Sequence, residues 1–117
     1  MVAEPTPPTP EARGRVERRR WVRHPGTRIR AYVMTDPEAT PWGVKVLNIS
    51  AGGIGVNADR SLEADSVLTL RLDHPAARFS CFVETRLVYA IPKPDGTLVV
   101  GGEFLRELSD EELRQLL

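Results

Sequence analysis

The stretch of the chain that decides the fold is residues 42–56, with the sequence WGVKVLNISAGGIGV. Residues 42–49 are rich in β-branched and other apolar side chains, which predicts a β-strand. Residues 50–53 end in two glycines and predict a tight connection. Residues 54–56 then predict a second, short strand. The stretch therefore indicates two strands joined by a turn.

The alternation along residues 42–49 predicts which side chains share a face. Val44, Val46 and Asn48 are expected on one face of the strand, and Ile49 on the other. Asn48 and Ser50 are expected to point the same way at the end of the strand. The glycines that follow allow a ligand to come close to the backbone. Taken alone, this stretch is more typical of an ordinary turn than of a binding site.

The rest of the chain repeats the pattern of short strands separated by turn residues. A bend or bulge is expected in the long fifth strand, before its apolar run at 87–91. Ser109 and Glu112 form a capping box that starts a short amphipathic helix. Six strands and one helix indicate an all-β fold, either an antiparallel barrel or a sandwich, capped by the helix. The other expected strands are 28–34, 65–72, 79–91 and 97–105.

The charge of the chain is balanced overall but unevenly placed. The 117 residues carry a formal net charge of +0, which argues against a general nucleic-acid-binding protein. Residues 11–30, however, hold eight arginines and two glutamates, whereas the acidic residues collect in 59–73 and 103–112. This distribution indicates a localised anion site. Residues 1–17 are rich in proline and arginine and predict a flexible tail, followed by one domain over 18–117.

Four arginines occupy a span of six residues at the start of this domain: Arg18, Arg19, Arg20 and Arg23. The planar guanidinium group donates two parallel hydrogen bonds, which suits a phosphate or the edge of a guanine. The ordinary alternative for such a run is a solvated, flexible arm.

Two motifs in this order resemble the PilZ domain, the bacterial receptor module for cyclic di-GMP. Arg19 and Arg23 match its R-x-x-x-R motif, and Asn48, Ser50 and Gly53 match its [D/N]-x-S-x-x-G motif. The resemblance implies a six-stranded antiparallel β-barrel of split-barrel type with a C-terminal helix. It also implies that ligand binding orders the arginine arm and signals to a separate partner protein. The binding residues that it implies are Arg18, Arg19, Arg20, Arg23, Asn48, Ser50, Gly52 and Gly53, with His24 as a lesser candidate.

Other classes of function have less support in the sequence. Two histidines and one cysteine, far apart, give no metal-binding or Cys-His spacing, so neither an enzyme nor a cofactor is expected. The single cysteine, the lack of a signal peptide and the lack of an apolar run of membrane-spanning length indicate a cytoplasmic protein without membrane insertion. Two alternatives stay open: an adaptor that binds a protein partner without cyclic di-GMP, and a binder of single-stranded nucleic acid. The number of ligand molecules bound, one or two, is also open.

Overall fold

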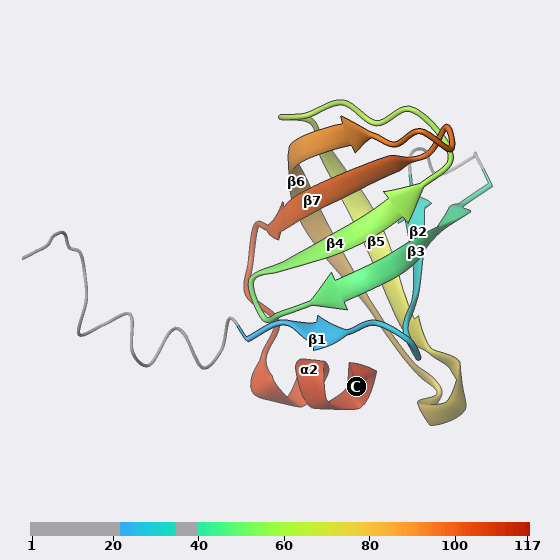
Figure 1. Ribbon diagram of the computed structural model, residues 1–117. Coiled ribbons are helices and arrows are strands. Elements are labelled where there is room, and N and C mark those ends of the chain that lie inside the picture. The colour runs from blue at the N-terminus through green and yellow to red at the C-terminus, as the bar shows by residue number, and fades with distance from the viewer. Residues whose placement is uncertain (1–21, 35–39) are drawn as a thin grey trace, which may run out of the picture.

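The computed structural model describes residues 22–34 and 40–117 and forms a closed antiparallel barrel of six strands with a short C-terminal helix (Figure 1). This confirms the barrel over the sandwich. The elements are β1 (His24–Pro25), β2 (Arg30–Met34), β3 (Trp42–Ile49), β4 (Gly53–Ala58), β5 (Val67–His74), the 3₁₀ turn η1 (Pro75–Ala77), β6 (Phe79–Pro92), β7 (Leu98–Phe104) and α2 (Asp110–Leu116).

The barrel closes because β3 has partners on both sides. It pairs with β4 along one edge, and with β2 and then β1 along the other. The ring continues from β2 through β5, β6 and β7 back to β4, and every pairing is antiparallel. Alternate side chains of these strands fill the interior. The fully buried ones include Val33, Ile49, Ile54, Leu72, Val83 and Val100.

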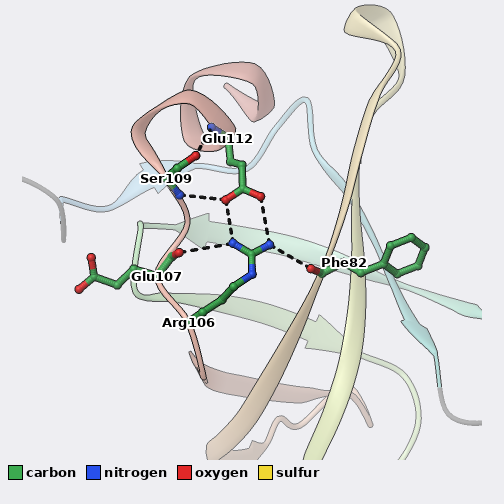
Figure 2. A network of polar contacts seen from close by, with 5 residues as sticks. All are labelled: Phe82, Arg106, Glu107, Ser109 and Glu112. Atoms are coloured by element: carbon green, nitrogen blue, oxygen red, sulfur yellow. Dashed lines mark hydrogen bonds and ion pairs between the residues drawn. The ribbon is translucent and has the colours of Figure 1, made fainter.

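The helix α2 closes one end of the barrel, at the same end as β1 (Figure 1). Leu108 and Leu116 are completely buried there. Ser109 and Glu112 form the predicted capping box. Arg106 connects the helix to β6, because its guanidinium donates to both carboxylate oxygens of Glu112, at 2.8 and 3.0 Å, and to the carbonyl of Phe82 at 3.1 Å (Figure 2).

The structure corrects the sequence prediction for the end of β3. The register between β3 and β4 shifts between Val46 and Asn48, so Leu47 is an extra, bulged residue. A bulge reverses the alternation beyond it. Ile49, predicted on the face opposite Val46, is therefore buried together with Val46, and Asn48 lies on the outer face instead.

The other strand predictions need smaller corrections. The predicted bulge in β6 exists, but the register shifts between Leu87 and Tyr89, inside the apolar run rather than before it. The fourth predicted strand starts at Val67 and not at residue 65, because Asp65 has a φ of 71° and ends a turn. The two-residue strand β1 was not predicted.

Candidate functional site

The arginine motif and the asparagine motif meet through β1. His24 pairs with Ile49 and Pro25 pairs with Asn48 in the antiparallel register of β1 and β3. Arg23, directly before β1, is thereby placed beside the end of β3. Its Nη1 donates a hydrogen bond of 2.8 Å to Oδ1 of Asn48, across 25 positions of sequence. Two of the predicted site residues are thus in direct contact.

The bulge at Leu47 gives Asn48 its position in this contact. Without the extra residue, the side chain of Asn48 would follow Val46 into the barrel, as the alternation predicted. With it, Asn48 lies half-buried on the outside, opposite Gly55 of β4. The amide therefore faces the exposed guanidinium of Arg23 rather than the core.

Ser50 does not share the outward direction of Asn48, so the expectation that the two side chains point the same way is wrong. Ser50 is completely buried in the turn between β3 and β4. Its hydroxyl accepts from the backbone N–H of Gly52 at 3.3 Å and donates to the carbonyl of Gly53 at 3.5 Å. The backbone N–H of Ser50 also donates to that carbonyl, at 2.9 Å. Ser50 thus shapes the turn and is not exposed on the site.

Gly52 and Gly53 open onto a pocket of about 280 Å³ that reaches across to β6 and β7. At Gly53, a Cβ atom would lie 2.5 Å from the carbonyl oxygen of Gly102, so only glycine fits this approach of β4 to β7. The ring of Tyr89 lies against Gly101 in the same pocket. The residues that line it are Arg23, Gly52, Gly53, Val88, Tyr89, Gly101, Gly102 and Glu103.

Sequence reasoning missed the wall of this pocket that β6 and β7 provide. Val88 and Tyr89 are 53% and 45% exposed, so a ligand can reach both side chains. The signal in the sequence was the glycine pair Gly101–Gly102, of which Gly101 is the cross-strand partner of Tyr89 and Gly102 that of Leu87. The pocket therefore combines the guanidinium of Arg23, the aromatic ring of Tyr89, glycine backbone and the carboxylate of Glu103. Asn48 does not line it but holds Arg23.

Of the other predicted residues that the structure describes, Asn48, Ser50 and His24 do not line this pocket. Arg18, Arg19 and Arg20 lie outside the described residues. His24 is half-buried in β1 and lines a different hollow, of about 250 Å³, between β1 and the C-terminal end of α2.

The described residues place neither a candidate metal site nor a reactive thiol near the pocket. They contain no group of three or more His, Cys, Asp or Glu side chains that could hold a metal ion. Cys81 is buried in the barrel, and that burial raises the pKa of its thiol to about 11. In the same part of the chain, no helix is long and apolar enough to span a bilayer.

Comparisons with known proteins agree with the barrel. A family model of the PilZ domain matches residues 17–117. Among solved structures, the chain is similar to the inhibitor of motility MotI/DgrA of Bacillus subtilis, with a TM-score of 0.62 and 20% identity. The similarity covers 82% of this chain and 46% of that one, so the chain spans about half the length of the solved neighbour. A comparison with curated proteins finds no match.

Proposed function

The chain belongs to the PilZ domain family, and we propose that it is a receptor for cyclic di-GMP. Domains of this family are receptor and adaptor modules and not enzymes. The observation that carries the proposal is the contact between Arg23 and Asn48, because it joins the two family motifs at the mouth of an open pocket.

Arg23 is suited to bind the ligand because most of its donors are unused within the described residues. Its bond to Asn48 engages Nη1, and the side chain is exposed. A guanidinium can therefore turn its remaining N–H groups toward a phosphate or the acceptor edge of a guanine. Asn48 both accepts and donates, so it can hold Arg23 and still offer its amide N–H to the ligand.

The pocket beside these residues is suited to one base of the ligand. Its volume of about 280 Å³ is below that of sites for whole drug-sized molecules, ~300–1,000 Å³. One guanine would enter, and the ring of Tyr89 would offer it a stacking surface. Gly52 and Gly53 would let the base approach the backbone, and Ser50 would hold the turn that presents them.

The rest of the ligand would extend toward the arginine arm. Arg18, Arg19 and Arg20 would contact its phosphates and second guanine by charge-assisted hydrogen bonds. This contact would order the arm against the barrel and present a changed surface to a separate, cytoplasmic partner protein.

Calorimetric titration of the purified full chain with cyclic di-GMP tests the proposal, with GMP and single-stranded RNA as controls. Arg23→Ala should weaken binding at least about tenfold, because each charge-assisted contact contributes ~1.5–3 kcal/mol. Arg114→Ala is the matched control. Arg114 is an exposed arginine on α2 that pairs with Glu111 at 2.7 Å and does not line the pocket.

The outcomes separate the candidate functions. Saturable binding of cyclic di-GMP that is lost in Arg23→Ala and retained in Arg114→Ala supports the receptor. A folded protein that gives no heat with any of the three ligands refutes it and leaves the adaptor that binds only a protein. Binding of RNA with a steep dependence on salt would instead indicate a nucleic-acid binder.

A further inference from the structure

A third hollow lies beside the turn between β1 and β2, and shares Thr27 and Arg28 with the hollow that His24 lines. It has a volume of about 420 Å³ and is formed by the turn before β2, the start of β2, the end of β5 and the 3₁₀ turn η1. None of its residues belongs to the PilZ motifs. We call it the basic hollow, and its lining residues are Thr27, Arg28, Arg30, His74, Pro75 and Ala76.

Arg28 and Arg30 present two positive charges on the same side of the chain. They alternate with Ile29 and Ala31, which are 6% and 1% exposed and point into the core. Both arginines are exposed and line the same hollow. Arg28 lies in the turn before β2, and Arg30 is the first residue of β2.

No acidic side chain of the described residues pairs with either arginine. Asp73 is the cross-strand partner of Arg30, but its carboxylate accepts from Ser80 at 2.8 Å and pairs with Arg71 at 3.4 Å. Arg106 differs from Arg28 and Arg30 because it pairs with the carboxylate of Glu112. The basic hollow thus concentrates positive charge in a chain whose net charge is +0.

The wall of the basic hollow is held in place before any ligand arrives. His74 donates from Nδ1 to the backbone carbonyl of Gln115 at 3.0 Å, which ties the end of β5 to α2. Pro75 begins η1, and the N–H of Arg78 closes that turn on the carbonyl of Pro75 at 3.1 Å. A site with fixed walls loses little conformational entropy on binding.

We propose that the basic hollow is a docking site for an acidic segment of a partner protein. An acidic segment carries several carboxylates close together, so it can offer one to each of the two arginines that line this hollow. Each guanidinium can bind one carboxylate through two parallel hydrogen bonds. The volume, about 420 Å³, is that of a site for several side chains and exceeds what a single oxyanion needs. This site goes beyond the proposed receptor function and does not depend on it.

Titration of the ¹⁵N-labelled full chain with a hexaglutamate peptide, monitored by NMR, tests the docking site. The largest chemical-shift changes are expected at the amides of Thr27, Arg28, Arg30 and Ala76. The double variant Arg28→Ala/Arg30→Ala should weaken peptide binding at least about tenfold, because it removes two charge-assisted contacts. It should leave the affinity for cyclic di-GMP unchanged, since neither arginine lines the pocket beside Arg23.

The matched control is Lys45→Ala/Arg86→Ala, which also removes two exposed positive charges but lies outside both hollows. It should retain peptide binding. Equal loss in the two double variants would show only unspecific attraction and would overturn the proposal. Shift changes away from the basic hollow would overturn it too. Inorganic phosphate that binds there as tightly as the peptide would identify a small-anion site and overturn the docking site. Thermal melts confirm that each variant is folded.

Discussion

Replacing Gly53 with alanine tests whether the site depends on the close approach of β4 to β7. An added Cβ would lie 2.5 Å from the carbonyl oxygen of Gly102, about 0.9 Å inside the 3.4 Å at which ordinary contact begins. The obstructing atoms are backbone atoms of β7, which cannot rotate away as the end of a side chain can. The two strands must therefore separate locally, in the region where their register joins Gly53 to Glu103.

The expected cost follows from this geometry. Overpacking that shifts backbone in a packed interior costs ~1–3 kcal/mol. For a domain of this size a loss of 1 kcal/mol lowers Tm by about 4 °C, so Gly53→Ala should lower Tm by roughly 4–12 °C. Binding of cyclic di-GMP should weaken as well, because Gly53 lines the pocket beside Arg23.

Gly43→Ala provides the control with the same chemical change. Gly43 lies in β3, and an added Cβ would meet its nearest atom, Cε1 of Tyr32, at 3.8 Å, which is ordinary contact. The effect of alanine on the unfolded chain is the same in both variants, so Gly43→Ala should be neutral or stabilising by up to ~1 kcal/mol. Thermal unfolding followed by circular dichroism compares them. If Gly53→Ala melts at the same temperature as Gly43→Ala, the inference about the close approach is wrong.

Three further predictions concern the barrel and its helix. The hydrogen bonds from Arg106, and next the backbone N–H of Ser109, lower the pKa of Glu112 below its ordinary 4.5. The bond between Arg106 and the ionised Glu112 therefore stabilises the fold fully above pH 4.5, and this stabilisation is lost as the pH falls through the lowered pKa. The Tm difference between the wild type and Glu112→Gln should shrink in acid. Leu116 is completely buried, so Leu116→Ala should cost ~2–5 kcal/mol in a denaturant titration. The thiol of Cys81 is buried and its pKa is about 11, so iodoacetamide at pH 8 should label it only after unfolding, as mass spectrometry would show.

Much of the barrel could be predicted because its strands alternate between buried and exposed side chains. In β5, Leu70 and Leu72 are buried whereas Val67 is exposed, and the capping box at Ser109 marked the start of α2. These signals are local, since each depends on residues within a few positions of one another. Local patterns therefore gave the elements, and the family resemblance gave their closure into a barrel.

The features that the sequence did not predict arise from pairing between distant strands. The bulge at Leu47 exists because one more residue lies on β3 than on β4 between two pairs of partners. No residue type marks such an insertion, so alternation placed Asn48 on the wrong face. Tyr89 was missed for a related reason: it reaches the pocket through the register of β6 with β7.

The assembly of the candidate site depends on the short strand β1. Its two residues are too few for a periodic pattern, and one of them is Pro25, which lacks an N–H donor. The turn that follows can lie against β3 only because Gly26 has no side chain: a Cβ there would lie 2.1 Å from Cγ1 of Val46. This close approach fixes the register that places Arg23 beside Asn48. A glycine after the arginine motif, and not the arginines alone, therefore determines whether the two motifs can form one site.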